Sequence, residues 1–236
     1  MRIDKFISEA GIASRKECAK AAKAGLLLVD GVAVKDTSKH IDPENCRVTF
    51  MGRDIEYKKF VYVLLNKPEG YVSATEDGKF PVVTELLPEE LQRRGLFPVG
   101  RLDKDTLGVM LLTDDGKLAH TVLSPKKHVS KVYYFECAEP LCDGAEELFK
   151  NGVVLKDGYE CKSAELSMAE DRLSGEITLT EGKYHQIKRM IASQSNRVTY
   201  LERVSFASLP FGNLPPRGEW RYLSAEEEAC LIAAAN

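Results

Sequence analysis

Residues 97–116 read FPVGRLDKDTLGVMLLTDDG, and this stretch decides the fold of the chain. Its apolar run Val109–Leu112 is short and continuous, which is typical of a buried strand. A loop between Gly100 and Gly108 precedes that run and carries an acid, Asp103. The pattern predicts a loop that presents a carboxylate just before a buried strand.

Two further acids, Asp114 and Asp115, follow the strand. Thr113 is expected to cap a helix there, with both acids in the first turn, where the helix dipole favours negative charge. We therefore interpret Asp114 and Asp115 as residues that stabilise a helix start. Asp103 has no such local role, which makes it the candidate catalytic carboxylate.

Strand patterns lie on both sides of this stretch. Val61–Leu65 reads as a buried strand that stops at the turn-rich sequence NKPEG, and short helical signals lie in Thr84–Leu91. Lys131–Cys137 reads as another strand, in which alternate residues share a face, so Lys131 and Tyr133 look into one space. On the strand pattern alone, Tyr133 fits a core tyrosine better than a site residue.

The N-terminal residues predict two helices. Apolar residues recur at helical spacing from Ile3 to Ala10, and Gly11 ends that helix. Ser14 and Glu17 have the spacing of a capping box, in which each satisfies a backbone amide of the other. A second helix therefore starts at Ser14 and stops at Gly25.

A hairpin is expected next. Asp30-Gly31 lies between the apolar runs Leu26–Val29 and Val32–Val34, and this dipeptide suits a turn with positive φ at both central residues. Gly52-Arg53 reads as the turn of a last small strand pair, and residues 58–60 read as a short hinge. The first module is therefore two helices and a hairpin.

The second helix carries a basic stripe, because Lys16, Lys20 and Lys23 recur at helical spacing. Arg15 extends this stripe, and Arg2 and Lys5 of the first helix are candidates to join it. We expect the stripe to contact RNA phosphates while Ala19, Ala22 and Leu26 pack inward. The alternative is an ordinary solvated helix face.

Composition limits the other possibilities. The chain has 236 residues and a net charge of −3, but residues 117–135 hold four lysines and no acid, and residues 183–203 hold five basic residues and one acid. Such basic blocks suggest a polyanion-binding surface, although solvated faces would look the same. No apolar run is long enough to span a membrane, and the N-terminus does not resemble a signal peptide, so a cytoplasmic location is expected.

The cysteine and histidine patterns argue against a metal site. The six cysteines are scattered without a CxxC pair, and we expect them to be reduced and mostly buried. The four histidines are too far apart for zinc-ligand spacing. No GxGxxG or P-loop sequence occurs.

The motifs together resemble a known family. The pattern RxDKF…GxxSR…VDGxxV over residues 1–57 resembles the S4 RNA-binding domain. NKPEG, GRLDKDTLGVMLLTDDG, KVYYF and EGKYHQIKRM resemble the ribosomal small-subunit (RsuA) family of pseudouridine synthases, over essentially the whole chain. The KYH form is more similar to the small-subunit branch than to the large-subunit branch.

This resemblance implies a reaction and a role for the matching residues. Asp103 matches the catalytic aspartate, which attacks as a nucleophile or promotes departure of the base. Tyr133 matches the active-site tyrosine, which can stack on that base. The uracil is released at N1, rotates and rejoins the ribose through C5, so the reaction is an isomerisation without cofactor.

The basic partner of Asp103 is expected within HQIKRM. On a helix with about 100° per residue, Ile187, Met190 and Ile191 form the core face. Lys188 lies at the flank of that face and is our choice for the partner, whereas Arg189 points nearly opposite and is read as a phosphate contact. Many relatives carry arginine at the position of Lys188, which would bind a carboxylate bidentately.

Three further residues are candidate RNA contacts. Arg101 precedes Asp103 by two residues and could occupy the place of a flipped base, or it could form a structural ion pair. Lys131 shares the face of Tyr133. His185 fits an RNA contact and a structural histidine equally well.

The architecture that the resemblance implies is an α+β fold. It has an S4-like domain at residues 1–57, a hinge at residues 58–60 and a catalytic domain at residues 61–236. The catalytic domain is expected to hold a mixed, mainly antiparallel sheet in two subdomains that flank a basic cleft.

The expected partner is 16S ribosomal RNA in a pre-ribosomal particle, with uridine 516 as the modified site and a monomeric enzyme. Two alternatives remain. One is a synthase of the same family that acts on 23S ribosomal RNA, and the other is a non-catalytic S4-type RNA-binding or ribosome-assembly factor.

Overall fold

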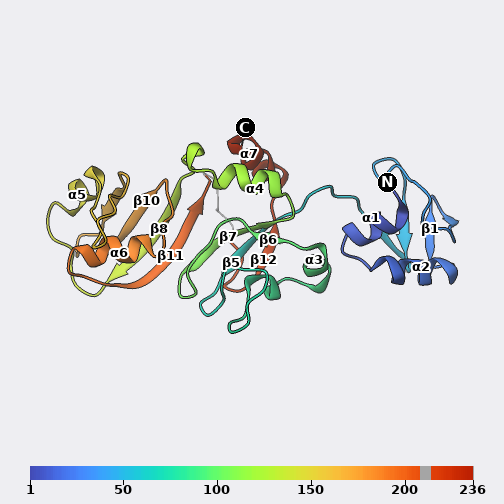
Figure 1. The fold of residues 1–236 in the computed structure, drawn as a ribbon, viewed down its shortest axis with the longest axis horizontal. Coiled ribbons are helices and arrows are strands. Elements are labelled where there is room, and N and C mark those ends of the chain that lie inside the picture. Colours follow the sequence, from blue (N-terminus) through green and yellow to red (C-terminus); the bar gives the residue numbers. More distant parts are fainter. Residues whose placement is uncertain (208–213, 236) are drawn as a thin grey trace. The chain divides into compact units, whose positions relative to one another are not determined.

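The structure is a computed structural model that describes residues 1–207 and 214–235 (Figure 1). Contacts between Cα atoms divide the chain into two compact units. The first contains Met1–Val61 and Leu87–Phe97, and the second contains Tyr62–Leu86 and Pro98–Asn236. Each unit is described by itself below.

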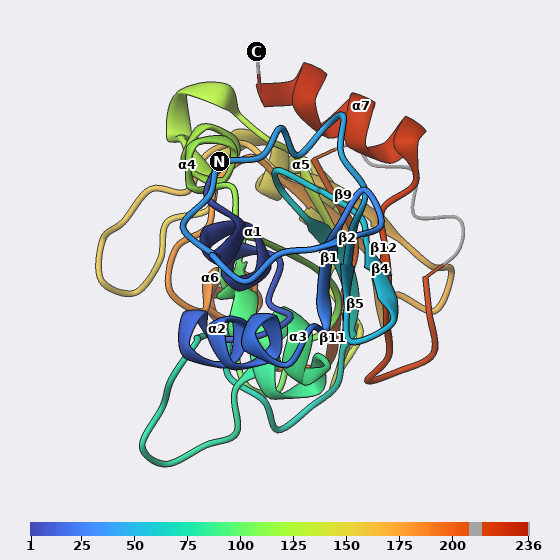
Figure 2. The ribbon, with the colours of Figure 1, turned by 90° about the vertical axis from the view of Figure 1, so that its right-hand side faces the viewer.

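The N-terminal unit combines helices with a small antiparallel sheet. Its sheet has the strand order β2-β1-β3-β4, and Figure 2 shows α1 and α2 beside it. The elements are α1 (Ile3–Glu9), α2 (Arg15–Lys23), β1 (Leu27–Val29), β2 (Val32–Ala33), β3 (Val48–Phe50), β4 (Arg53–Ile55) and α3 (Glu89–Arg94). Phe6, Ile7, Leu27 and Val48 lie in the core that the helices and sheet share.

The local signals in this unit are confirmed. The Ser14 hydroxyl accepts from the Glu17 amide at 3.2 Å, and the Glu17 carboxylate accepts from the Ser14 amide at 2.8 Å, which completes the capping box. Asp30 and Gly31 both have positive φ, 50° and 79°, as the predicted hairpin turn requires.

One packing prediction in this unit is wrong. Leu26 is 45% exposed, and Leu27, the first residue of β1, fills the core position instead. The chain leaves the helix through Gly25 in the left-handed conformation, and this changes the side on which the next residue lies. On α2 itself, Cys18, Ala21 and Ala22 are buried, whereas Ala19 is half-buried.

The second unit is built on an eight-stranded mixed sheet. Its strand order is β12-β5-β7-β11-β8-β10-β9, and β6 pairs with β7 outside this path. The strands are β5 (Tyr62–Lys67), β6 (Phe97–Pro98), β7 (Leu107–Thr113), β8 (Lys131–Cys137), β9 (Glu165–Met168), β10 (Ser174–Leu179), β11 (Val198–Phe206) and β12 (Trp220–Tyr222). The pairs along the path are antiparallel except β7–β11, which confirms the predicted mixed, mainly antiparallel sheet.

The parallel pair β7–β11 joins the two halves of this sheet. Only two register pairs form it, Glu202 with Leu107 and Arg203 with Gly108. Gly108 has a φ of +96°, and a Cβ atom there would lie 2.2 Å from the carbonyl oxygen of Arg203. Glycine is therefore required where the two strands meet.

Short helices cover this sheet. They are η1 (Val83–Leu86), α4 (Gly116–Leu123), η2 (Pro125–Lys127), α5 (Ala145–Asn151), α6 (Gln186–Ser193) and α7 (Ala225–Ala235). Helix α4 packs against α7, α5 against β9, and α6 against β11. No helix within residues 1–207 and 214–235 is long and apolar enough to cross a membrane.

The start of α4 differs in detail from the prediction. Asp115 is the N-cap itself, and its carboxylate accepts from the Leu118 amide at 3.0 Å. Thr113 ends β7, and its hydroxyl accepts from the Asp115 amide at 3.0 Å. The helix-stabilising role of Asp115 is thus confirmed, but Thr113 is not the cap, because the strand runs one residue further than its apolar run indicates.

The cysteines are free, as expected, but they are not all buried. Cys18, Cys137 and Cys161 are buried and Cys46 is half-buried, whereas Cys142 and Cys230 are exposed. Burial raises the pKa of the Cys18 and Cys137 thiols to about 11, so both stay protonated at neutral pH.

Candidate active site

Asp103 lies on the loop that joins β6 to β7. The Ser73 hydroxyl holds this loop from one side, because it accepts from the Leu102 amide at 2.9 Å and donates to the Leu102 carbonyl at 2.8 Å. Behind Asp103, the Thr106 amide donates to the Asp103 carbonyl at 3.1 Å and closes a tight turn. The carboxylate is therefore presented by a backbone that is fixed on both sides.

Lys67, at the end of β5, donates hydrogen bonds to the backbone of the same loop. Its side chain is fully buried, and its Nζ donates to the carbonyls of Pro68 at 3.1 Å, Lys104 at 3.2 Å and Thr106 at 2.7 Å. Burial lowers the pKa of Lys67 to about 8. The sequence NKPEG thus supplies the cation that holds the Asp103 loop in place.

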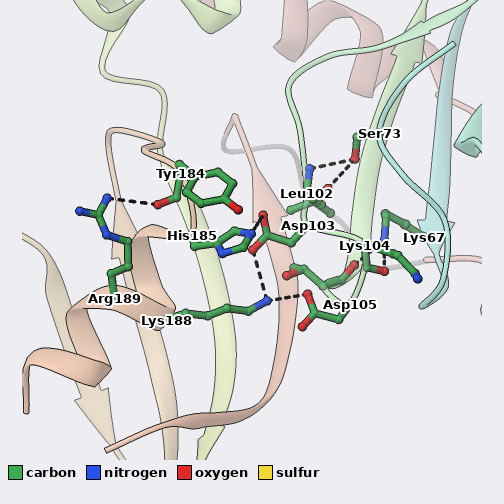
Figure 3. A network of polar contacts seen from close by, with 11 residues as sticks. Lys67, Ser73, Leu102, Asp103, Lys104, Asp105, Tyr184, His185, Lys188 and Arg189 are labelled. Atoms are coloured by element: carbon green, nitrogen blue, oxygen red, sulfur yellow. Dashed lines mark hydrogen bonds and ion pairs between the residues drawn. The ribbon is translucent and has the colours of Figure 1, made fainter. Parts of the chain in front are cut away.

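Helix α6 brings the basic partner to Asp103 (Figure 3). The Lys188 Nζ lies 3.3 Å from one Asp103 carboxylate oxygen, and the His185 Nε2 lies 3.5 Å from the other. His185 precedes the helix in the left-handed conformation, with a φ of 49°. This uncommon backbone state turns the imidazole toward Asp103, whereas a regular N-cap residue would aim its side chain at the helix amides.

A second carboxylate, Asp105, shares Lys188. The Lys188 Nζ donates to Asp105 at 2.5 Å and lies between the two acids (Figure 3). Burial would raise the pKa of Asp105, but the hydrogen bond and charge of Lys188 outweigh it, so the pKa is lowered. One lysine therefore holds two ionisable carboxyl groups on one loop.

Buried polar contacts fix the turn before α6. Gln186 is 4% exposed, donates to Glu181 at 2.6 Å and accepts from the Lys183 amide at 2.9 Å. Glu181 also accepts from the Tyr159 hydroxyl at 2.8 Å and from the Lys162 amide at 2.9 Å. These contacts set the position from which His185 and Lys188 reach Asp103.

The floor of the cleft comes from the strands. Tyr133 on β8 and Arg203 on β11 lie opposite each other in the ladder, and both line the cleft together with Lys131. The predicted shared face of Lys131 and Tyr133 is confirmed. Arg203 is 1% exposed, and its Nε donates to the Val109 carbonyl at 2.7 Å.

Comparison with known proteins decides the family. A profile described as RNA pseudouridylate synthase matches residues 61–193, and the S4 domain matches residues 1–45. The ribosomal small subunit pseudouridine synthase A of Yersinia pestis is 38% identical over 235 residues, which cover 99% of each chain. The chain belongs to the RsuA-type pseudouridine synthases. It is therefore an enzyme of the isomerase class.

Two further similarities cover nearly the full length of this synthase. An uncharacterized RNA pseudouridine synthase of Bacillus subtilis (strain 168) is 41% identical over 230 residues, 96% of each chain. A solved structure titled "Crystal structure of pseudouridylate synthase" is 32% identical, with a TM-score of 0.68 over 98% of this chain and 99% of the other. The α+β fold with an N-terminal S4 domain is confirmed.

Some predicted RNA contacts of the synthase have partners within the protein. Arg189 forms an ion pair with Asp157 and donates to the Tyr184 carbonyl at 3.4 Å. Its predicted direction, away from Asp103, is visible in Figure 3. Arg101 lines the cleft and is exposed, with no ion pair to any described residue. Contact of either residue with RNA stays a prediction.

The predicted RNA-binding cations of the N-terminal unit also fall into two classes, exposed ones and ones that lie beside an acid. Lys16, Lys20 and Lys23 are exposed along one side of α2, and so is Arg15. In contrast, Arg2 pairs with Asp4 at 2.6 Å, and Lys5 lies 3.5 Å from Glu9. The predicted basic stripe is therefore present on α2, whereas Arg2 and Lys5 of α1 are engaged with acids.

Sequence reasoning missed four residues of the synthase site. They are Lys67, Ser73, Asp105 and Arg203. The double acid of GRLDKD was a usable signal for Asp105, because a second carboxylate two residues from the first can share its cation. The motif NKPEG marked the segment of Lys67 but not its contacts with the Asp103 loop. For Ser73 and Arg203 no local signal existed, since their contacts join residues far apart in the chain.

Residues 1–207 and 214–235 contain no group of three or more His, Cys, Asp or Glu side chains that could hold an ion.

Proposed function

We propose that this enzyme converts one uridine of 16S ribosomal RNA, uridine 516, to pseudouridine with Asp103 as the catalytic residue. The observation that carries the catalytic part is the Asp103 carboxylate, one quarter exposed, between Lys188 and His185 at the mouth of a cleft. The target is proposed from the relatives that are named for the small ribosomal subunit and match over their full length.

The cleft has the size and lining that a single nucleotide needs. Its volume is about 790 Å³, and its walls carry Asp103, Tyr133, Tyr184 and His185. A uridine stacked within an RNA helix cannot expose N1, C5 and C1′ to a protein carboxylate, so the enzyme is expected to flip the nucleotide out. Aromatic side chains in the cleft then replace the lost stacking.

Each side chain has a definite task in this scheme. The Asp103 carboxylate acts at C1′ while the bond from C1′ to N1 breaks, and Lys188 orients that carboxylate from its far side. Tyr133 stacks on the base and keeps it in the cleft. The base turns within the cleft, C5 bonds to C1′, the C5 proton is lost and N1 gains one, so that uridine and pseudouridine have the same atoms.

The test is a pseudouridine map of ribosomal RNA from a strain that lacks this gene. Loss of pseudouridine at position 516 of 16S RNA, with return on expression of the wild type but not of Asp103→Asn, is the expected result. A site lost in 23S RNA instead would overturn the proposed target and keep the reaction. No lost site in either RNA would favour a binding or assembly role.

The setting of the reaction is also proposed. We expect a cytoplasmic monomer that meets its uridine in a pre-ribosomal particle, where the S4 domain holds a second part of the same RNA and raises the effective concentration of the target. Sedimentation of the purified enzyme tests the monomer. Comparison of rates on protein-free 16S RNA and on assembly intermediates tests the substrate, and a faster reaction on protein-free RNA would contradict the particle.

A further inference from the structure

Two cations at the floor of the cleft have no acidic partner among the residues that the structure describes. Arg203 and Lys131 form no ion pair with a carboxylate among the described residues, although Arg203 is 1% exposed and Lys131 is half-buried. The Arg203 Nη2 is buried without any hydrogen-bond partner in the described chain. Within residues 1–207 and 214–235, the Lys131 ammonium has one hydrogen bond, to the Val129 carbonyl at 2.8 Å.

The two charges lie beside the same aromatic ring. The Arg203 Cζ is 4.7 Å and the Lys131 Nζ is 5.9 Å from the centre of the same ring, Phe206. Burial and the charge of Arg203 lower the pKa of Lys131 to about 8, and burial lowers the pKa of Arg203. Two unpaired positive charges in a poorly solvated place destabilise the folded chain.

Two other cations of this unit are compensated. Lys67 donates to three carbonyls, and Lys188 binds two carboxylates. Among the described residues, the lack of an acidic partner therefore distinguishes Lys131 and Arg203, beside Tyr133, from Lys67 and Lys188. A fixed positive potential at this place stabilises negative charge that appears only during the reaction.

We propose that Lys131 and Arg203 stabilise the uracil anion between breakage of its bond to the ribose and formation of the new one. When the bond from C1′ to N1 breaks, N1 keeps the electron pair and conjugation spreads the charge to O2 and O4. At this stage an oxygen of the Asp103 carboxylate has donated an electron pair to C1′ and is bonded to it. C5 then donates a pair to C1′, the carboxylate is released, the C5 proton goes to solvent and N1 takes one up.

Two charges suit this task better than one directed hydrogen bond. The base turns between the two bonds, so its oxygens change position while the negative charge persists. Positive potential from Lys131 and Arg203 acts in each orientation, since it depends on distance more than on the direction of one lone pair. This inference rests on the pseudouridine chemistry of the cleft but not on which RNA is the target.

The central test replaces Lys131. Lys131→Met keeps a long, unbranched side chain and removes its charge. The single-turnover rate at saturating RNA is therefore expected to fall about 10²-fold. RNA affinity should stay close to that of the wild type. Lys150→Met, at an exposed lysine of α5 outside the cleft, is the matched control and should leave the rate unchanged. The RNA is a 16S transcript, or a 23S transcript if the wild type modifies only that one.

The pH profile separates charge from shape. Lys131 loses its charge as pH rises through about 8, so kcat/KM of the wild type should fall there. Lys131→Arg keeps the charge, so its kcat/KM should fall less than that of the wild type over the same range. Any fall that remains is assigned to Lys67, whose pKa is also lowered to about 8. The groups around Lys131 that can affect its charge come from several elements. Arg203 lies on β11 and Tyr133 on β8, whereas the ladder partner of Lys131 on β10 is the uncharged Leu179. Asp103, His185 and Lys188 line the same cleft.

Arg203→Gln tests the second charge, with a melting curve to establish that the variant folds. The expected result is a loss of rate at unchanged affinity, and the Lys131 variants decide the matter if Arg203→Gln does not fold. An unchanged saturated rate in Lys131→Met would overturn the proposal. So would a defect confined to affinity with a shallower salt dependence, which would make Lys131 a phosphate contact. A wild type inactive on 16S but active on 23S RNA would overturn only the target.

Discussion

The basic residues on α2 and those in the catalytic cleft have opposite environments. Lys16, Lys20 and Lys23 are exposed, and their side chains have no ion pair within the described residues. Lys67 and Lys188 have fixed acceptors, and their positions follow from the surrounding fold. The same residue type thus occurs as a solvated charge in one unit and as a fixed charge in the other.

This difference separates binding from chemistry. An exposed lysine can follow an RNA backbone of variable shape, but its interaction is screened by salt and is equal in the ground and transition states. A fixed group that acts at a reacting carbon depends on exact geometry, because a misplacement of about 1 Å there can cost about 10²-fold in rate. Substitutions in the two units should therefore change different measured quantities.

The largest effect is expected at Asp103. Asp103→Asn keeps the shape of the side chain but removes the carboxylate, so single-turnover activity should fall by at least about 10³-fold. RNA affinity should stay near the wild-type value, which filter binding can measure. Asp105→Asn is the matched control, because this acid shares Lys188 but lies two residues further along the loop. An equal loss in both variants would show that the pair, and not Asp103 alone, is required.

Lys67 should affect both stability and rate, although it lies behind the loop. Lys67→Met removes three hydrogen bonds from a charged donor and leaves three carbonyls without it, so the free energy of unfolding should fall by about 2–3 kcal/mol. The displaced loop should lower the rate about 10²-fold. Urea denaturation and single-turnover assays measure the two effects.

The control for Lys67 is Lys156→Met, at an exposed lysine outside the cleft. Its unfolding free energy should match that of the wild type. A stable Lys67→Met enzyme with full activity would show that Ser73 and the turn at Thr106 are sufficient to hold the loop.

A smaller effect is expected at Tyr133. If stacking is its main task, Tyr133→Phe should keep much of the activity, and Tyr133→Ala should lose about 5- to 150-fold. Rates at saturating RNA provide the measurement. A Phe variant as inactive as the Ala variant would assign the hydroxyl a part in proton transfer.

The smallest effect on chemistry is expected from the α2 stripe. Replacing Lys16, Lys20 and Lys23 together with Ala should weaken RNA binding and make the slope of log K against log salt shallower by roughly two to three units. The rate at saturating RNA should hardly change, because uniform binding lies outside the chemical step. Titrations at several salt concentrations and one saturating time course decide this.

The control for the stripe lies on the neighbouring helix. Lys5→Ala removes a lysine that lies beside Glu9, and it should change the salt slope much less than the triple variant. An unchanged slope in the triple variant would reduce the stripe to a solvated face. A large fall in its saturated rate would mean that the N-terminal unit also positions the uridine.

The sequence predicted those parts of the fold whose causes are local. The capping box of Ser14, the turn at Asp30-Gly31 and the strand Lys131–Cys137 were all identified from residues within one element. The predicted partner of Asp103 was also correct, since the core face of α6 leaves Lys188 on its flank. In each case a short periodic pattern contains the full physical cause.

The rest depended on contacts between distant segments. Arg203 looks like an ordinary strand residue in the sequence, and only the position of β11 between β7 and β8 buries it. Leu26 was misplaced because one left-handed glycine redirects the chain. The left-handed conformation of His185 was also not predictable from its local sequence. It depends on the turn before α6, which the contacts of Gln186 with Glu181 and with the Lys183 amide hold in place.

The place of β11 in the sheet has a consequence for how the enzyme is made. This strand, Val198–Phe206, joins the half that carries Asp103 to the half that carries Tyr133, and it lies late in the chain. During translation at roughly 5–20 residues per second, β11 leaves the ribosome roughly 5–20 s after Asp103 has done so. The nascent chain therefore holds an open edge on β7 for seconds, and its catalytic centre stays incomplete until β11 has emerged.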